Sequence, residues 1–539
     1  MSGSITLENR FGVNKMELIS LKYAIFVIVL LVLYYCFPKK YRWYVLLAGS
    51  MAYYVIICKW YVLFIIFTIC TTYGSTIWID KLLKEQNALV KSHKEDWDRQ
   101  TRKEYKEKGR KKRVAVMLFA LLCNFGILAF LKYIPYAGEL GLLLPLGISF
   151  YTFQSMGYVM DVYREIVEPE KNFLKVALFV SFFPQIIQGP IAIYDKLAGQ
   201  LYEGHSLRLE NLQKGALLVL WGVMKKLVIA DRAVNIINFV MDKPMDFSGT
   251  YVFFAAVVYA LQLYADFSGG IDIVRGIAEM FGITMSTNFN HPYFSRSLTE
   301  YWHRWHMTLG DWCRNYIFYP LSISKRFLNF GKWLKPRFGA HISKVLPGCI
   351  ASVITFIVIG VWHGANMKYL YFGLWNGIVI MLAELFAPVN KKVSGGFFKL
   401  TGLREKGIFA TIVSVLWTFM LILVGYYFDI AENASTAFHM LFKSVTDFHI
   451  SELGINNIIL NLGACGLDEY DIFLLIICTL LWFFISFVEE NKKLDMRDFI
   501  LSRKLPLRWA IIYLGIFIVI IFGYYGPGVN PADFVYMQF

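Results

Sequence analysis

The sequence has little charge, and it lacks the short motifs of the common nucleotide-dependent and metal-dependent enzymes. Charged residues make up 17% of its 539 residues, and the mean hydropathy is +0.50. It contains no Cys-x-x-Cys pair, no His-Glu-x-x-His motif, no Gly-x-Ser-x-Gly elbow, no Walker A loop and no dinucleotide fingerprint. The composition excludes an ordinary soluble globular protein.

The sequence also lacks the alternating apolar and polar residues of a membrane β-barrel. Its apolar runs are continuous, and several reach the roughly 20 residues that a helix needs to cross a bilayer. We therefore predict an all-α, polytopic transmembrane helical bundle of about 11–13 membrane segments around a transmembrane tunnel. No cleavable signal peptide is expected, and no internal repeat is visible, which counts against a transporter built from paired halves.

Basic residues set the expected topology. Cytoplasmic loops are enriched in Lys and Arg, and none follows Arg508. Both termini are therefore expected outside. The expected parts are N-terminal membrane helices (1–79), a basic cytoplasmic loop (80–113), a core (114–428), an extracellular loop (429–470), C-terminal membrane helices (471–526) and an extracellular aromatic tail (527–539).

The net charge of +15 is explained by basic cytoplasmic loops better than by nucleic-acid binding, so we expect no nucleic-acid partner. Segment 80–113 carries thirteen Lys and Arg against seven Asp and Glu. We expect it to form an amphipathic helix that lies on anionic lipid. The eight cysteines are scattered, mostly within apolar runs, and are expected to be core residues.

Polar residues interrupt some apolar segments. The run 173–193 contains Pro184, Gln188 and Pro190, which is typical of a re-entrant segment, since broken backbone is tolerated only where protein or water covers it. A second polar break is expected at 265–272. There Asp266 and Asp272 could form a carboxylate pair, although a helix-end contact fits a polar break better.

The stretch 288–320 combines ionisable and aromatic residues between apolar runs. Each ionisable group is costly in hydrocarbon, so a membrane interface or a wet cavity in the bundle is the expected place. If the stretch is helical, Trp302, Trp305, His306 and Leu309 share one face. His303 and His306 lack a third ligand at a supporting spacing, so no metal site is expected.

His363 is the strongest single candidate for a functional residue, because it ends a predicted apolar helix in the sequence Val361-Trp-His-Gly364. An ionisable residue at membrane depth is a functional candidate, and a neutral imidazole can take a proton from a hydroxyl near pH 7. A structural hydrogen bond at the water interface is the alternative.

The last ten residues, 530–539, are unusually aromatic for a chain end. They include Phe534, Tyr536 and Phe539. Such a tail either docks against protein or anchors at the membrane interface.

Five ordered motifs give a specific resemblance. Pro145 to Gln154, Phe183 to Pro190, Tyr264 to Gly269, the Asn288…Arg304-Trp-His306 pattern and Val361-Trp-His-Gly364 resemble the membrane-bound O-acyltransferase (MBOAT) family. The similarity runs from about residue 20 to the end and is strongest to the bacterial branch that acylates cell-surface polysaccharides, such as alginate and peptidoglycan O-acetyltransferases and the teichoic acid D-alanyl transferase. His303, where an Arg is common, and Arg275 depart from the family pattern.

The resemblance implies roles for particular residues. It makes His363 the catalytic His, His306 the second functional His, and 114–428 the family core. It also matches Phe534, Tyr536 and Phe539 to a Phe-x-Tyr-x-x-Phe motif in which the Tyr hydroxyl relays the acyl group. We add Trp302, Trp305, Trp362, Asn366 and Gln188 as substrate-binding candidates, with Trp362 or Asn366 as oxyanion donor.

The implied activity is acyl transfer in a bacterial cell membrane. The expected donor is acetyl-CoA or an acyl carrier protein thioester, with no bound cofactor. The expected acceptor partner is an extracellular SGNH-type protein that passes the acyl group to polysaccharide. Three alternatives stay open: D-alanyl transfer to teichoic acid from a carrier protein, a transporter, and a non-catalytic scaffold.

Overall fold

In the computed structural model the chain folds into helices joined by loops. The structure describes residues 16–401, 404, 407–454, 457, 463–526 and 534. Over these residues it contains helices and no strands, which confirms the predicted all-α class. The chain divides into two compact units: the first holds residues 1–219 and 271–286, and the second holds 220–270 and 287–539. Each is described by itself.

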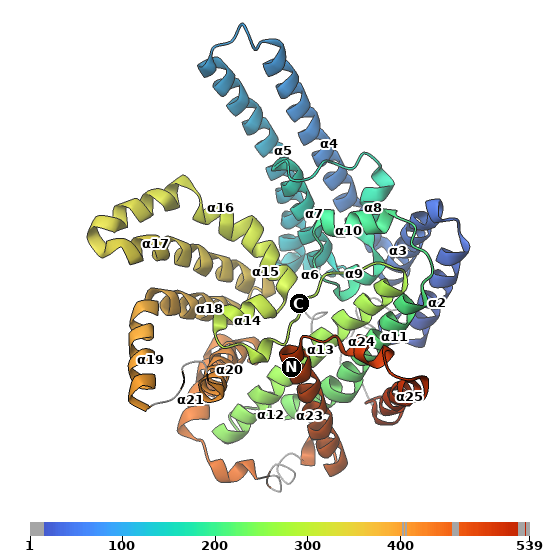
Figure 1. The fold of residues 1–539 in the computed structure, drawn as a ribbon, viewed down its shortest axis with the longest axis vertical. Coiled ribbons are helices and arrows are strands. Elements are labelled where there is room, and N and C mark those ends of the chain that lie inside the picture. The colour runs from blue at the N-terminus through green and yellow to red at the C-terminus, as the bar shows by residue number, and fades with distance from the viewer. Residues whose placement is uncertain are drawn as a thin grey trace. The chain divides into compact units, whose positions relative to one another are not determined.

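The first unit consists of apolar helices and a long helical hairpin (Figure 1). Its glycine at 147 has φ 71° and lies so close to Ile186 that any Cβ would overlap the carbonyl oxygen of that residue. The helices are α2 (Leu21–Cys36), η1 (Lys39–Tyr41), α3 (Arg42–Cys58), η2 (Lys59–Tyr61), α4 (Val62–Ser92), α5 (Arg99–Tyr133), α6 (Pro135–Glu139), α7 (Ile148–Tyr163), α8 (Phe173–Ser181), α9 (Phe183–Gln188), α10 (Tyr194–Tyr202) and most of α11 (Leu209–Met224).

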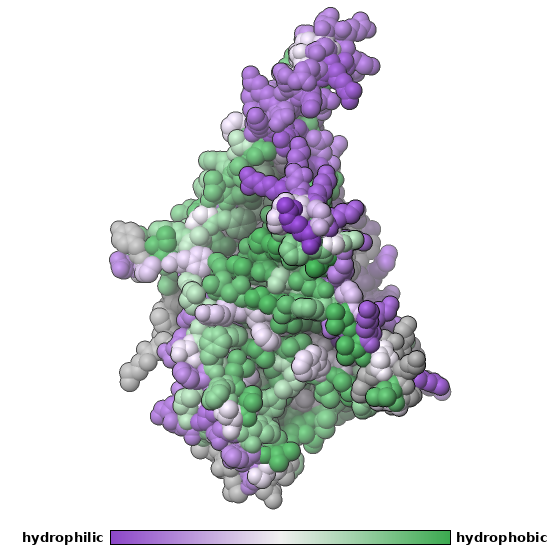
Figure 2. Space-filling view, turned by 90° about the vertical axis from the view of Figure 1, so that its left-hand side faces the viewer, coloured by the Kyte–Doolittle hydropathy of each residue, from purple (hydrophilic) through white to green (hydrophobic). Residues whose placement is uncertain are grey.

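The basic segment 80–113 differs from its expected form. It does not make a separate helix: α4 and α5 continue through it and form the hairpin at the top of Figure 1. The turn is closed by Asp98, whose carboxylate accepts the backbone N–H groups of Gln100 and Thr101 and caps α5. Figure 2 shows this end of the molecule as hydrophilic. The spanning helices therefore extend beyond their apolar part.

The second unit carries the remaining helices. Its longest helix, α17, bends back on itself at Gly339, where φ is 80°. The helices are η3 (Lys225–Ala230, a π-helix), α12 (Asp231–Met241), most of α13 (Gly249–Met280), η4 (Pro292–Phe294), α14 (Leu298–Arg304), α15 (Met307–Cys313), η5 (Arg314–Phe318), α16 (Tyr319–Ser322), α17 (Lys325–His363), α18 (Met367–Leu385), α19 (Ala387–Thr401), α20 (Ile408–Ile430), α21 (Ala434–Thr446), η6 (Ile450–Leu453), η7 (Gly463–Cys465), α23 (Glu469–Lys492), α24 (Met496–Leu501) and α25 (Leu505–Phe522).

Seven helices of the described residues are long and apolar enough to cross a membrane, or eight if the bent pair α18–α19 is one span. The apolar helices Leu21–Cys36 and Phe173–Gln188 are shorter than this length. The chain is therefore a multi-pass membrane protein. The sequence predicted about 11–13 segments because it also counted short apolar stretches such as α7.

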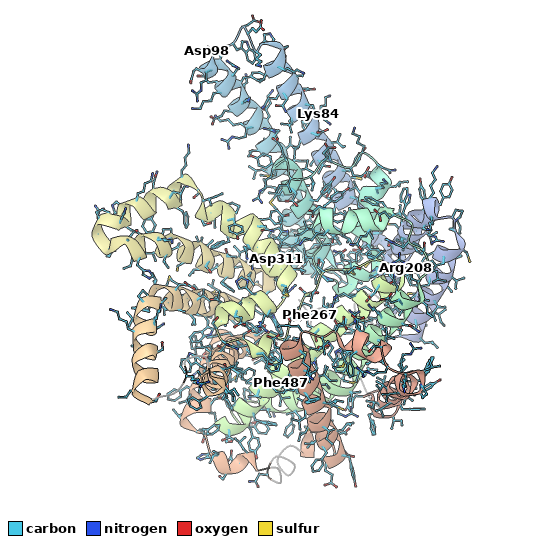
Figure 3. All side chains as sticks on the ribbon, viewed as in Figure 1. Lys84, Asp98, Arg208, Phe267, Asp311 and Phe487 are labelled. Atoms are coloured by element: carbon cyan, nitrogen blue, oxygen red, sulfur yellow. The ribbon has the colours of Figure 1, made fainter. Side chains whose placement is uncertain are left out.

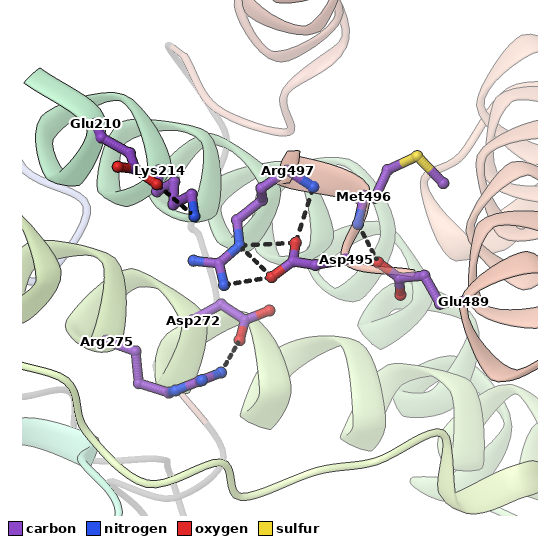
Figure 4. Close-up of polar contacts among 8 residues, drawn as sticks. All are labelled: Glu210, Lys214, Asp272, Arg275, Glu489, Asp495, Met496 and Arg497. Carbon is purple, nitrogen blue, oxygen red and sulfur yellow. Dashed lines mark hydrogen bonds and ion pairs between the residues drawn. The ribbon is translucent and has the colours of Figure 1, made fainter. Parts of the chain in front are cut away.

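The predicted polar break at 265–272 is wrong, because α13 is continuous from Gly249 to Met280. The polar side chains are satisfied within the helix or by neighbours. Asp266 pairs with Lys226 in the second unit at 2.6 Å. Asp272 pairs with Arg275 one turn along at 3.5 Å, in the first unit's part of the helix (Figure 4). Residues three apart lie on the same side of a continuous helix, so the Asp272–Arg275 pair needs no break.

Candidate active site

The stretch 288–320 forms two short helices with a sharp break between them. Helix α14 ends at Arg304 and α15 begins at Met307. Between them His306 has φ 44° and ψ 51°, a left-handed conformation that costs energy for a residue with a Cβ. The continuous helix considered from the sequence is therefore wrong at this point.

Asn288 holds this break in place. Its backbone oxygen accepts the N–H of Met307 at 2.9 Å. Its side-chain oxygen accepts the backbone N–H of Thr308 at 3.1 Å and the hydroxyl of Thr308 at 2.9 Å. The same oxygen lies 3.2 Å from Nδ1 of His306. Asn288 is fully buried, so these bonds are shielded from water.

These contacts fix the tautomer of His306. The side-chain oxygen of Asn288 can only accept, so Nδ1 of His306 carries the proton and donates it. The other ring nitrogen, Nε2, is then the one with the lone pair. Burial, together with the nearby charge of His363, lowers the pKa of His306 to about 3. The ring is neutral near pH 7.

His363 is positioned by the close packing of α17 against α18, which lie side by side in Figure 1. A Cβ at Gly360 would overlap the carbonyl oxygen of Tyr369, and one at Gly373 would overlap that of Phe356. Small residues at these positions let the two backbones approach. His363 is the last residue of α17, and its ring stacks near Tyr369 at 6.0 Å between centroids.

His306 and His363 line one pocket in the second unit, although 56 residues lie between them in the sequence. The cavity is small, about 40 Å³. Its wall is mostly aromatic and aliphatic. It is lined by Leu263, Phe267, Tyr301, Trp302, Trp305, His306, Leu309, His363, Phe372, Asn376, Ile422, Tyr426 and Asp429.

Three tyrosines in and behind the wall form a chain of hydrogen bonds in which each hydroxyl donates its proton to the next oxygen. Tyr293 donates to the backbone oxygen of Ala260 at 2.6 Å. Each phenol has one proton, so Tyr426 donates to Tyr293 at 3.1 Å and Tyr301 donates to Tyr426 at 2.7 Å. These hydroxyls have no proton left for a reacting oxygen.

Two further polar side chains face the pocket. Asn376 accepts the indole N–H of Trp302 at 2.9 Å and donates one amide hydrogen to the oxygen of Phe372 at 2.8 Å. Its amide nitrogen has a second hydrogen. Asp429 accepts the hydroxyl of Tyr259 at 2.7 Å.

The structure separates the candidates from the sequence into those at the pocket and those that are not. Trp302, Trp305, His306 and His363 line the pocket together, and Trp362 lies against it with its ring 6.4 Å from that of His306. Asn366 does not line it: its side chain caps α18 by accepting the N–H of Lys368.

One candidate lies in the first unit, and the tail motif is described only in part. Gln188 belongs to the first unit, where it is fully buried at the end of α9. Of the tail motif, Phe534 is described, whereas Tyr536 and Phe539 lie outside the described residues.

Several pocket residues were not identified from the sequence. Phe267 of α13, labelled in Figure 3, packs edge-on against His306 with 4.9 Å between ring centroids. Asn376 and Asp429 stand in apolar helices, and a polar residue inside an apolar run was the available signal. Asp429 was placed at the start of an outer loop, but α20 continues to Ile430.

Residues 169–335 match the family model of the membrane-bound O-acyltransferases. This range includes Gln188 and His306 and ends before His363. The chain is 30% identical over 315 residues to a protein described as a probable alginate O-acetylase of Pseudomonas syringae pv. tomato, covering 58% of this chain and 54% of that protein.

Two other relatives act on different polymers. A peptidoglycan O-acetyltransferase of Helicobacter pylori is 29% identical over 363 residues, covering 60% of this chain and 63% of that protein. A teichoic acid D-alanyltransferase of Bacillus subtilis is 26% identical over 288 residues, covering 52% of this chain and 67% of that protein. The matched region spans little more than half of the first relative's length.

Proposed function

We propose that this chain is a membrane-bound O-acyltransferase, in line with the family model matched by residues 169–335, and that it transfers an acetyl group from a cytoplasmic thioester toward a cell-surface polysaccharide. The observation that carries the proposal is the pocket in which His306 and His363 meet. Its aromatic wall keeps water away from a reactive acyl group, the imidazole of His363 supplies the proton transfer, and that of His306 orients the reacting groups.

In the first proposed step the donor is acetyl-CoA and the acceptor is the hydroxyl of Tyr536. His363 takes the phenolic proton while the tyrosine oxygen attacks the thioester carbonyl. The new C–O bond forms, the C–S bond breaks, and the proton passes from His363 to the departing thiolate. His306 stays neutral, and the lone pair on Nε2 gives it a hydrogen-bond acceptor that orients the neighbouring groups.

The negative oxygen that develops on the carbonyl needs a hydrogen-bond donor. We assign this role to the second amide hydrogen of Asn376, because the three phenolic protons nearby are already donated. Loss of one such donor lowers kcat by roughly 10²–10³-fold. A wild-type kcat in the variant Asn376→Ala would contradict this role for Asn376.

In the second proposed step the acetyl ester on Tyr536 passes to a Ser of an extracellular SGNH-type partner and then to polysaccharide. This route requires the tail to lie outside the cell and the donor inside it, as the basic loops predict. Tyr536→Phe is the direct test: acylation of polysaccharide should stop, and full activity would leave the tail with an anchoring role only.

The carboxylate of Asp429 in the pocket wall makes D-alanyl a second acyl group to test. The cavity is far smaller than the ~150 Å³ that accepts benzene, which favours the three heavy atoms of acetyl. A carboxylate in the wall, however, pairs with the ammonium group of D-alanine. Membranes supplied with acetyl-CoA should form acyl-enzyme, and membranes supplied with a D-alanyl carrier-protein thioester should not; the reverse result would assign D-alanyl transfer.

The two histidines are tested by His306→Ala and His363→Ala, each expected to lower acylation by roughly 10²–10⁴-fold at equal protein level. His341→Ala, an exposed His on α17, is the matched control and should keep wild-type activity. If His363→Ala loses acylation but still binds the outer partner, a non-catalytic scaffold is rejected. Solute flux that persists without acyl donor would instead favour a transporter.

A further inference from the structure

A second set of buried charges lies outside the pocket, where η3, α12 and α13 meet. The ammonium group of Lys226 lies 2.8 Å from a carboxylate oxygen of Asp231 and 2.6 Å from one of Asp266. All three side chains are at most 3% exposed. Buried charges are costly even when paired, and in a membrane protein they mark functional sites. None of the three lines the pocket.

The local backbone favours this cluster. Residues 225–230 form a π-helix, a rare wide turn that is frequent at functional sites. Both consecutive lysines consequently reach α13: Lys226 binds Asp266, and the ammonium group of Lys225 donates to the hydroxyl of Ser268 at 2.8 Å. In a regular α-helix neighbouring side chains point about 100° apart.

The same elements hold the chain where it leaves α25. The backbone N–H of Tyr524 donates to the oxygen of Leu227 at 2.9 Å. The guanidinium of Arg232 donates to the oxygen of Phe522 at 2.6 Å and lies 5.7 Å from the ring of Tyr524. The end of α25 is thus fixed to η3 and α12 by contacts independent of the ion cluster.

The cluster itself contacts the C-terminal segment through Phe534. The ammonium group of Lys226 lies 4.5 Å from the centroid of this ring, which is 6% exposed. A cation this close to the face of a buried aromatic ring is attracted by the ring's quadrupole, most strongly where water is excluded.

We propose that the Lys226–Asp231–Asp266 cluster is the anchor for the aromatic C-terminal segment, holding Phe534 so that Tyr536 is positioned to receive the acyl group. This proposal rests on the proposed function for the role of Tyr536. Phe534 is two residues from Tyr536, and two residues span at most about 7 Å, so holding one limits the reach of the other.

The anchor and the pocket also share one helix. Asp266 is adjacent to Phe267, whose ring packs against His306. The cluster therefore lies one residue along α13 from a side chain that lines the pocket. Lys226 is a positioning residue in this arrangement, because its contacts are to Phe534 and to the two carboxylates.

The test uses the full-length protein in membranes and measures the tail directly. Gln538→Cys reports the accessibility of the tail to a maleimide, and mass spectrometry reports acyl-Tyr536. Phe534→Leu removes the aromatic face, whereas Phe534→Trp keeps one. We expect Phe534→Leu to raise the labelling rate and to lower acyl-Tyr536, each by about tenfold, and Phe534→Trp to stay close to wild type.

A double-mutant cycle separates the anchor from a general loss of folding. The neutral pair Lys226→Gln with Asp266→Asn should raise labelling when Phe534 is present and add little when Phe534 is already Leu. Labelling of Phe534→Leu at the wild-type rate, or fully additive effects, would overturn the anchor. If Tyr536→Phe keeps full polysaccharide acylation, the relay fails, while the labelling result still decides the anchor.

Discussion

At the scale of single residues, Asn288 determines the state of His306. Its one side-chain oxygen receives the Nδ1 proton of the ring, and the same oxygen binds both donors of Thr308. The ring is therefore held in one tautomer and in a strained backbone conformation. An arrangement of this kind is typical of a site that must be preorganised.

Replacing Asn288 by Asp should shift the pH dependence of acyl transfer. The substitution keeps an acceptor oxygen and adds a negative charge, which raises the pKa of His306 from about 3 toward its ordinary value near 6.5. Below the raised pKa the ring gains a proton and loses its lone pair, so activity should fall at pH 5.5 more than at pH 8. Acyl-enzyme formation at the two pH values measures this.

Asn290→Asp is the matched control, since Asn290 is exposed and contacts the break through its backbone N–H only. Its pH profile should follow wild type. An unchanged ratio of activities in Asn288→Asp would show that the protonation of His306 does not limit the reaction.

Single residues also show what could not be predicted from the sequence. Spacing indicated Trp302, Trp305, His306 and Leu309 as one helix face, and all four do line the pocket. They reach it across a helix break, not along one face. A left-handed residue such as His306 leaves no mark in a hydrophobic pattern, because the contacts that hold it come from a residue 18 positions away.

At the scale of elements, the packing of α17 on α18 places His363 at the pocket. The contact depends on Gly360 and Gly373, each of which faces a backbone oxygen of the other helix. The apolar pattern of the sequence predicted both helices, since their apolar runs are long. It gave no information on how closely they approach, because that distance depends on small residues meeting in space.

Gly360→Ala should therefore displace α17 from α18. The added Cβ overlaps the carbonyl oxygen of Tyr369, and overpacking of this kind costs about 1–3 kcal/mol. A 1 Å shift of His363 lowers the rate by roughly 10²-fold. Thermal stability in detergent and acyl transfer in membranes measure the two effects.

Gly348→Ala is the control on the same helix, where an added Cβ meets nothing within 4 Å. It should be neutral, or stabilise by up to about 1 kcal/mol through helix propensity. Equal losses in Gly360→Ala and Gly348→Ala would mean that the close contact does not position His363.

At the scale of the whole molecule, the distribution of basic residues predicts the orientation in the membrane. The α4–α5 hairpin carries the densest Lys and Arg and forms the hydrophilic end in Figure 2. The positive-inside rule places it in the cytoplasm and places the segment after Asp429 outside. This orientation is what the proposed transfer from an inner thioester to an outer polymer requires.

Cysteines at exposed positions test the orientation. Ser92→Cys, at the end of α4, should react with a membrane-impermeant maleimide only after cells are permeabilised. Ser451→Cys, in η6, should react in intact cells. The wild-type chain gives the background from its own cysteines. Labelling of Ser92→Cys in intact cells would reverse the topology and contradict the proposed direction of transfer.

The sequence by itself indicated the class of protein, a resemblance to the family and the two histidines as candidates, because long apolar runs and ordered motifs are local properties of a chain. The tertiary structure decided that His306 and His363 share one pocket, that Asn288 sets the tautomer, that Asp266 pairs with Lys226 within an unbroken helix, and that Phe534 lies on that pair. Each of these depends on residues far apart in sequence, and only packing brings such residues within hydrogen-bond or ion-pair distance.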